Sequence, residues 1–152
     1  MDIAPIPGSA RQGSPDTRPA HPPQAAPGTG LRPTAALSPA EIHYLLGERR
    51  LGRLATADAT GRPHVVPVGW SYNADLGTID ISGHGFAITR KYRNAVANPQ
   101  AAFVVDDVLP PFRPRCVMVQ GPVEALDADR AGGREAMLRI HPDKVVSWGL
   151  DA

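Results

Sequence analysis

The sequence lacks three features that would each point to a class of protein. It has one cysteine, Cys116, among 152 residues, which excludes an intramolecular disulfide framework and a cysteine-rich zinc site. No apolar run approaches the ~18–20 residues that a membrane span requires. The first residues, broken by Pro5 and Pro7, do not form the apolar core of a secretory signal. We therefore expect a cytoplasmic protein that makes no membrane contact.

An excess of charge of one sign is also missing. Sixteen basic and fifteen acidic residues give a net charge of +1, so composition does not favour a nucleic-acid partner. The histidines do not follow the spacing of metal ligands either. His64, His84 and His141 are separated by whole expected elements, and a zinc site needs at least three converging ligands. We expect no metal.

Proline and glycine are concentrated at the start of the chain. Residues 1–36 hold eight of the seventeen prolines and four glycines but no aromatic residue. Such a segment buries too little apolar area to offset the entropy of ordering it, so we expect a disordered Pro/Gly/Ala-rich leader. A proline-rich ligand for a partner domain is the alternative. Residues 37–152 are then the folded domain, with thirteen residues of each charge after Leu37.

The first half of the folded domain begins with a helix and continues with strands. Ser38 and Glu41 form a capping-box pattern around Pro39, which predicts a helix to about Arg50 with Ile42, Leu45, Leu46 and Arg49 as its stripe. A period of two residues then predicts strands at 51–56, 64–70 and 78–82, with Ile79 and Ile81 pointing inward. Pro67 cannot donate to a strand ladder, which places it at an edge or a bulge. Turns are expected at 58–61 and 73–77.

The second half alternates in the same manner. We expect a helix over 87–98, a strand over 101–105 that is buried on both faces, and a strand over 115–126 interrupted at Gly121 and Pro122. A weak helix over 127–140 and a last strand over 144–148 follow. The short connections argue against a doubly wound sheet. The pattern predicts an α+β fold of mainly antiparallel β structure, closed into a compact barrel.

The segment from Ile81 to Arg93 carries the clearest chemical signal. A strand ends at Ser82, glycines flank His84, and a helix follows whose N-terminus offers free N–H groups and partial positive charge. Between Leu76 and Val105 the only acidic residue is Asp80, against three basic residues. The segment therefore suggests an anion site. A solvated basic helix face, with glycines that serve the turn alone, is the alternative.

Three other features have plain structural interpretations. Cys116 has no histidine–aspartate pattern nearby and is expected to fill the core. Asp106 and Asp107 are expected in a solvated turn at a strand end rather than in acid–base catalysis. Trp148 is either a core residue or a wall that stacks on a ligand. No set of residues suggests a catalytic group of the protein's own.

Several segments together resemble a known family. In order, they are Leu51–Thr56, Gly61–Val68, Thr89–Asn94, Asn98–Pro99, Ala102–Asp107, Arg113–Arg115, Arg139–Pro142 and Ser147–Leu150. This order resembles the pyridoxamine-phosphate-oxidase-like split-barrel proteins, and in particular an actinobacterial branch of coenzyme F420-dependent enzymes. The resemblance covers nearly the whole chain after Leu37. It implies a six-stranded split β-barrel with peripheral helices, and a homodimer with two F420 or FMN sites at its interface.

The resemblance also assigns roles to residues. It implies that Lys91 binds the cofactor phosphate and that one strand lies along the ring, with other residues around them. The full implied set is Val66, Pro67, Val68, Ser82, Gly83, His84, Thr89, Arg90, Lys91, Arg113, Arg115 and Trp148. The last three would reach the cofactor from an adjacent strand or from the partner subunit. Gln120 stands where the family often has arginine.

The function implied is that of an oxidoreductase that transfers hydride to a small unsaturated or quinone-like substrate. A flavin or deazaflavin carries that chemistry itself, which agrees with the lack of a catalytic pattern. Pyridoxamine-phosphate oxidation is disfavoured, because the arginine-rich C-terminal segment of those enzymes is not found. Two alternatives remain: a non-catalytic carrier or sensor of flavin, F420 or haem on the same barrel, and an interaction protein that recruits a partner through the leader.

Overall fold

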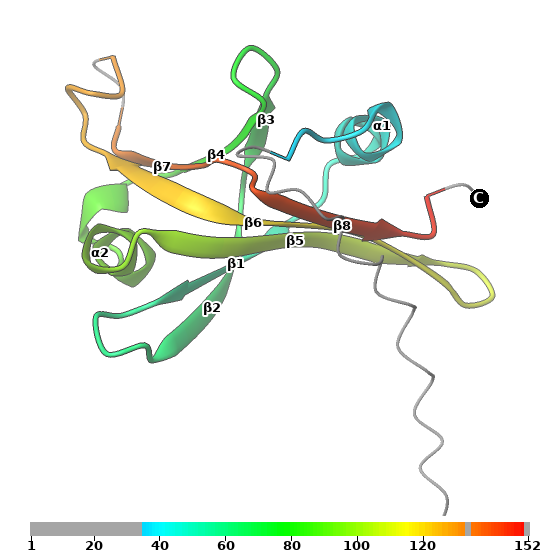
Figure 1. Cartoon of the computed structure of the whole chain (residues 1–152), viewed down its shortest axis with the longest axis horizontal. Coiled ribbons are helices and arrows are strands. Elements are labelled where there is room, and N and C mark those ends of the chain that lie inside the picture. Colours follow the sequence, from blue (N-terminus) through cyan, green and yellow to red (C-terminus); the bar gives the residue numbers. More distant parts are fainter. Residues whose placement is uncertain (1–34, 133–134, 151–152) are drawn as a thin grey trace, which may run out of the picture.

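The computed structural model describes residues 35–132 and 135–150 (Figure 1). Almost all of the expected leader lies outside them. The elements are α1 (Pro39–Gly47), β1 (Gly52–Ala57), β2 (Pro63–Val68), β3 (Ser71–Asn73), β4 (Thr78–Ser82), the 3-10 turn η1 (Phe86–Ile88), α2 (Arg90–Ala97), β5 (Gln100–Leu109), β6 (Arg113–Leu126), β7 (Met137–Ile140) and β8 (Lys144–Trp148). In the described ranges, no helix is long and apolar enough to cross a membrane.

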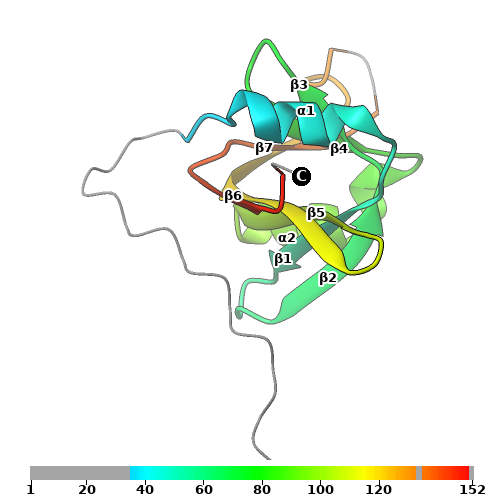
Figure 2. The same ribbon diagram turned by 90° about the vertical axis from the view of Figure 1, so that its right-hand side faces the viewer.

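The strands form one connected antiparallel sheet in the order β2-β1-β5-β6-β7-β4-β3, and β8 pairs with β6. The sheet curves around a common interior, with α1 on the side of β3 and β4 and with β1 and β2 on the opposite side (Figure 2). The expected α+β class of mainly antiparallel structure is confirmed. The sheet has eight strands rather than the expected six. The two additional strands are β3 and β7.

The long strand β6 joins the two parts of the barrel. Its first half pairs with β5 and β8, and its last residues pair with β7. The change occurs at Gly121, where an added Cβ would collide with the carbonyl oxygen of His141. The strand runs through Gly121 and Pro122 without the interruption expected from the sequence. Glycine is required there by the close approach of two backbones.

The core fills the space between the two parts. Leu54, Ile79, Ile81 and Leu138 have no exposed surface, and Phe103 is 1% exposed. Ile79 and Ile81 therefore point inward as expected. Cys116 is also buried, as its expected role in the core requires.

The prediction of a helix over residues 127–140 is wrong. A turn follows β6, and residues Met137–Ile140 form β7 between β4 and β6. Ala136, Leu138 and Ile140 are buried at every second position, which is the period of a strand with one buried face. Pairing on both sides outweighs the weak helix propensity of the segment.

Other boundaries differ by a few residues. The capping box at Ser38 and Glu41 is confirmed, but α1 ends at Gly47 instead of near Arg50. The second helix begins at Arg90, after η1, instead of at Ala87. In β5 the outer residues Ala102 and Val104 are partly exposed, so the expectation of two buried faces is wrong. The Asp106–Asp107 pair lies within β5 and not in a turn.

Candidate functional site

The segment from Ser82 to Lys91 forms the strand–turn–helix expected from the sequence. Ser82 is the last residue of β4, and Ser82, Gly83 and His84 are exposed. Gly85 has φ 59°, a left-handed conformation that glycine adopts without strain. Phe86 is 3% exposed and anchors the turn to the core. The turn is thus held from below while its outer surface stays open.

The first turn of α2 is capped by Thr89. Its hydroxyl donates to the carbonyl oxygen of Phe86 at 2.7 Å and accepts from the backbone N–H of Tyr92 at 3.4 Å. The N–H groups of Arg90 and Lys91 precede the first carbonyl–amide bonds of the helix, so they point out of its N-terminus. This geometry suits a phosphate group.

Three basic side chains surround this helix start. Arg90, Lys91 and Arg93 make no ion pair with any residue of the ranges that the structure describes. The ammonium of Lys91 lies 4.9 Å from the centroid of the Phe86 ring, which fixes its position by a cation–π contact. The positive charge of the site is therefore not compensated by these described residues.

The acidic residue nearest in sequence, Asp80, is already paired. Arg139 donates to its two carboxylate oxygens at 3.0 and 2.8 Å, and Thr78 and Asn73 also donate to it. Although burial works to raise the pKa of Asp80, these hydrogen bonds keep it below its ordinary value. Asp80 thus neutralises Arg139 rather than the basic residues of α2.

His84 does have an acidic neighbour. Its Nδ1 lies 3.2 Å from Oε1 of Glu135, and its side chain is fully exposed. The imidazole therefore stands at the rim of the turn, where it can meet a ligand only from the outside.

The expected ring-binding residues Val66, Pro67 and Val68 lie on β2. This strand is at the end of the sheet order and pairs with β1 alone, so the edge position expected for Pro67 is confirmed. Helix α2 also contacts β1, because Asn94 of α2 donates a hydrogen bond to the hydroxyl of Thr56 of β1 at 3.1 Å. Since β1 contacts both β2 and α2, the expected phosphate-binding and ring-binding segments lie on one side of the molecule (Figure 1).

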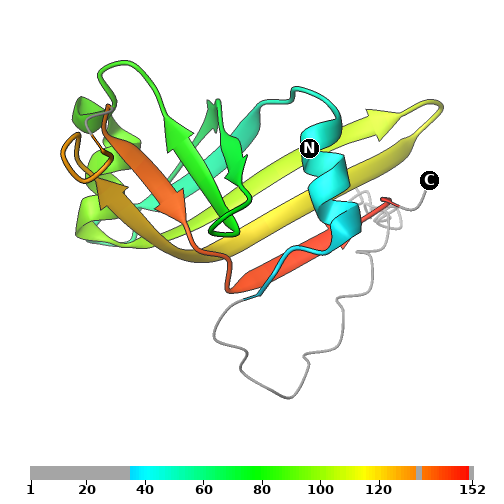
Figure 3. The ribbon, with the colours of Figure 1, turned by 90° about the horizontal axis from the view of Figure 1, so that it is seen from above.

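Arg113, Arg115 and Trp148 lie elsewhere. They sit near the β5–β6 hairpin and the end of β8, at the opposite end of the long axis from α2 (Figures 1 and 3). Arg115 binds Asp107 through two hydrogen bonds of 2.8 and 2.6 Å. Trp148, opposite Cys116 in the sheet, is 36% exposed and is not a core residue. One chain does not bring these residues to the Lys91 site.

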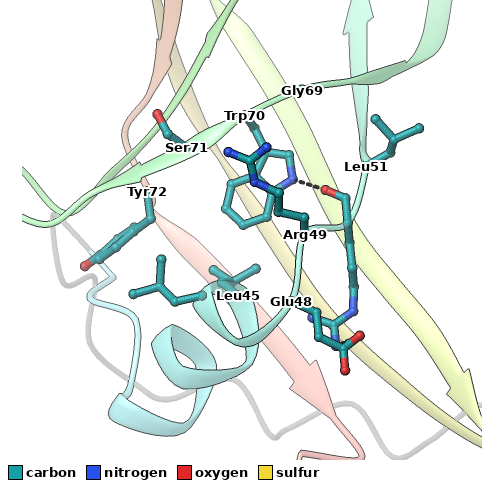
Figure 4. A pocket seen from close by; sticks show the side chains of 10 residues that line it. Leu45, Glu48, Arg49, Leu51, Gly69, Trp70, Ser71 and Tyr72 are labelled. Carbon is teal, nitrogen blue, oxygen red and sulfur yellow. Dashed lines mark hydrogen bonds and ion pairs between the residues drawn. The ribbon is translucent and has the colours of Figure 1, made fainter.

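A pocket that was not predicted from the sequence lies between α1 and the connection from β2 to β3. Its volume is about 570 Å³, and its walls include Leu45, Arg49, Gly69, Trp70 and Tyr72 (Figure 4). The indole N–H of Trp70 donates to the carbonyl oxygen of Arg50 at 2.9 Å. The only sequence signal was a glycine and a tryptophan directly after an apolar strand.

The sequence of the folded part matches one protein family. Residues 38–148 match the model described as pyridoxamine 5'-phosphate oxidase. The chain belongs to the pyridoxamine 5'-phosphate oxidase family. The match begins at the N-cap of α1 and ends at the last residue of β8, so it spans every helix and strand described above.

This member of the pyridoxamine 5'-phosphate oxidase family has a characterised relative. It is similar to the 5a,11a-dehydrotetracycline/5a,11a-dehydrooxytetracycline reductase of Streptomyces rimosus, with 42% identity over 120 residues. These residues are 73% of this chain and 82% of the relative. The protein is an oxidoreductase.

Solved structures of the same fold agree with the family. A conserved hypothetical protein of Mycobacterium tuberculosis has a TM-score of 0.59 at 21% identity and covers 80% of this chain and 91% of its own. A FAD-binding protein of Mesorhizobium loti has a TM-score of 0.55 at 25% identity, covering 73% and 92%. A structure described as an F420 reductase gives 0.52 at 23%, covering 68% and 94%. The first and third show the fold alone.

Proposed function

We propose that this oxidoreductase binds F420 or FMN with its phosphate at Ser82–Lys91 and reduces a small unsaturated or quinone-like substrate. The observation that carries the proposal is the basic start of α2. Arg90, Lys91 and Arg93 crowd a helix N-terminus, where cations are unfavourable, without a carboxylate partner in the described part of the chain. A bound phosphate removes that conflict.

The residues present fit a phosphate-bearing cofactor. Exposed backbone at Gly83 and Gly85 allows close approach, Ser82 offers a hydroxyl, and Lys91 is already held over Phe86. The edge of β2 at Val66–Val68 offers backbone groups along which a flat ring can lie. The names of the FAD-binding protein and of the F420 reductase, which share the fold, support a cofactor of the flavin or deazaflavin class.

This arrangement separates the role of the cofactor from that of the protein. A bound flavin or deazaflavin supplies hydride transfer, and the protein supplies position and electrostatics. Lys91 and the amides of α2 fix the phosphate end, while β2 fixes the ring. No acid–base residue of the chain is needed for the hydride itself, and the proton that completes the reduction comes from solvent. The name of the Streptomyces relative favours reduction of a carbon–carbon double bond as the direction of the reaction.

The outer face of the sheet supports a homodimer. Two rows of side chains cross it in register: Val65, Ala55, Ala102, Gln120 and Lys144, and then Pro67, Arg53, Val104, Met118 and Val146. Only two of these ten residues are charged, Arg53 and Lys144, and Arg53 is paired with Asp106 at 2.5 Å. Such an apolar face favours association with a second copy. A partner could then bring Arg113 and Trp148 to the site that they do not reach within one chain.

Titration of the full-length protein with F420, FMN and riboflavin, followed by fluorescence, tests the proposal. We expect F420 or FMN to bind more tightly than about 100 μM, or −5.5 kcal/mol. Lys91→Ala should weaken the phosphate-bearing cofactor by about 1.5–3 kcal/mol, because a charged hydrogen bond is lost. Sedimentation of the same samples tests the homodimer.

Arg62→Ala is the matched control, because Arg62 is an exposed basic residue in the β1–β2 turn. It should bind the cofactor as the wild type does. Equal affinity of the wild type for FMN and riboflavin would contradict a phosphate role for Lys91. Absence of binding by both F420 and FMN would reject the proposed function.

A further inference from the structure

The pocket beside α1 has a chemical character that the cofactor proposal does not use. It lies where the end of α1, the segment Glu48–Leu51 and the β2–β3 connection meet (Figure 4). Its volume of about 570 Å³ falls within the range of roughly 300–1,000 Å³ typical of small-molecule sites. The pocket can therefore hold a molecule of several rings.

Half of the lining residues are apolar or aromatic. Leu45, Leu46 and Leu51 line it together with the rings of Trp70 and Tyr72. Trp70 is fixed by its hydrogen bond to the carbonyl oxygen of Arg50 and by an edge contact with Phe103, with ring centroids 5.4 Å apart. A rigid indole in the wall favours a flat ligand that stacks or packs edge-on.

The charge within the pocket is positive on balance. Glu48 lies 3.3 Å from the guanidinium of Arg50, which also binds Asp107. Asp107 in turn binds Arg115, so two acidic and two basic groups compensate one another. Arg49 is exposed and makes no ion pair or hydrogen bond within residues 35–132 and 135–150. Its guanidinium is a planar donor suited to a carboxylate or an enolate. The hydroxyls of Ser71 and Tyr72 add polar groups.

The pocket is continuous with the strand proposed to lie along the cofactor ring. Gly69, in its wall, directly follows Val68. Leu51, on the other wall, directly precedes Gly52, which pairs with Val68. The pocket therefore begins at the end of the strand along which the ring is proposed to lie, which is the side from which a hydride acceptor would approach.

We infer that this pocket is the substrate site and that it takes a flat molecule of several rings with an acidic oxygen, a carboxylate or an enolate, directed at Arg49. The inference rests on the proposed function, since the pocket is a substrate site only if the ring lies along β2. Trp70 packs against the rings of the substrate, and Arg49 orients its acidic edge.

Calorimetric titration with anthraquinone-2-carboxylate tests the assignment, with neutral anthraquinone-2-carboxamide as the matched probe. The carboxylate should bind the full-length protein more tightly than the amide. Arg49→Gln should weaken the carboxylate about tenfold or more, as loss of a charged hydrogen bond implies, and leave the amide unchanged. Arg62→Gln controls for a general change in charge. Equal binding of both probes, or no effect of Arg49→Gln, would reject the acidic substrate class.

Gly69→Phe provides an independent steric test. Gly69 lies in the pocket wall, and a Cβ added there meets no atom within 4 Å, so the backbone accepts a side chain at this position. Binding of the carboxylate should fall at least tenfold, while Ala59→Phe, in the exposed β1–β2 turn, should bind as the wild type does. Unchanged binding by Gly69→Phe would overturn the assignment.

Each variant is also titrated with F420 and FMN, and its melting temperature is measured. Wild type that binds neither cofactor rejects the proposed function itself. Wild type that binds a cofactor but not the anthraquinone probe rejects only the pocket. The two failures are therefore distinguishable.

Discussion

The two ends of this barrel use basic side chains in opposite ways. At the α1 end, Arg50 and Arg115 both bind Asp107, at 2.8 and 2.6 Å, and both lie over the ring of Tyr44, at 4.4 and 5.0 Å. At the α2 end, Arg90, Lys91 and Arg93 form no ion pair with the residues that the structure describes. Of these two sets of basic residues, only the set at α2 has charge that is available to a ligand; Arg49, in the wall of the pocket beside α1, belongs to neither set.

Tyr44, Arg50, Asp107 and Arg115 form a cluster, called the α1 cluster below, that attaches α1 to the sheet. Burial and the negative charge of Asp107 raise the pKa of Tyr44 to about 12, and its hydroxyl is buried without a hydrogen-bond partner in the described ranges. Nearby, Ser147 donates to Glu41 at 2.7 Å, which links the capping box of α1 to β8. Arg115 is therefore committed to holding α1, and the comparison favours Lys91 over Arg115 as a cofactor ligand.

The largest loss of stability is expected when the ion pairs of the α1 cluster are broken. Asp107→Asn leaves Arg50 and Arg115, whose side chains are 11% and 17% exposed, without their common carboxylate. We expect a loss of roughly 2–4 kcal/mol, because removing one partner leaves buried charge uncompensated. Chemical denaturation measures this free energy of unfolding.

The neighbouring residue is a matched control. Asp106 pairs with Arg53 on the exposed face, where both side chains are almost half exposed. Asp106→Asn should cost no more than about 1 kcal/mol, because solvent screens such pairs. If the two variants were equally stable, the α1 cluster would not hold α1 to the sheet through its ion pairs. The contrast between paired arginines at α1 and basic residues at α2 that are unpaired within the described ranges would then fail.

A smaller effect is expected in acid. The two hydrogen bonds from Arg115 hold the pKa of Asp107 below its ordinary value of 3.8. The folded state therefore gains stability from this carboxylate above about pH 4, and loses it as the pH falls through the lower pKa of the folded protein. Melting temperatures between pH 7 and pH 3 should fall less steeply for Asp107→Asn than for wild type. Parallel profiles would show that Asp107 does not contribute.

Local chemistry explains which features could be predicted from sequence. The capping box of α1, the edge position of Pro67 and the inward side chains of Ile79 and Ile81 each depend on a few neighbouring residues. The start of α2 was placed within three residues, because Thr89 and the glycines before it are local signals. The family resemblance, which depends on ordered local segments, is confirmed for the same reason.

Features that depend on distant partners could not be predicted. Strand β7 forms because β4 and β6 pair with it on either side. The residues of β7 alone do not predict this pairing. Arg50 and Asp107 are 57 residues apart, so Asp107 could be taken for a solvated turn residue. The pocket combines α1 with the β2–β3 connection, and only the folded chain brings Arg49 to Trp70.

The smallest predicted effect tests the α2 end. Arg90 is the first residue of α2 and is exposed, and no acidic residue occupies the first turn. Arg90→Glu should stabilise the apoprotein by about 0.3–1 kcal/mol, because a negative charge suits the helix dipole. Melting temperature should rise by about 1–4 °C. Affinity for FMN or F420 should fall, since the acid repels the phosphate.

Ala97→Glu at the other end of α2 separates the dipole from a general effect of added acid. Ala97 is the last helical residue and is exposed, and a negative charge there opposes the dipole. We expect a small decrease in melting temperature and unchanged cofactor affinity. A decrease for Arg90→Glu as well would mean that Arg90 stabilises the fold as Arg115 does. Opposite changes in stability and cofactor affinity at Arg90, measured on one sample, would instead identify a charge that favours ligand binding at the expense of the empty fold.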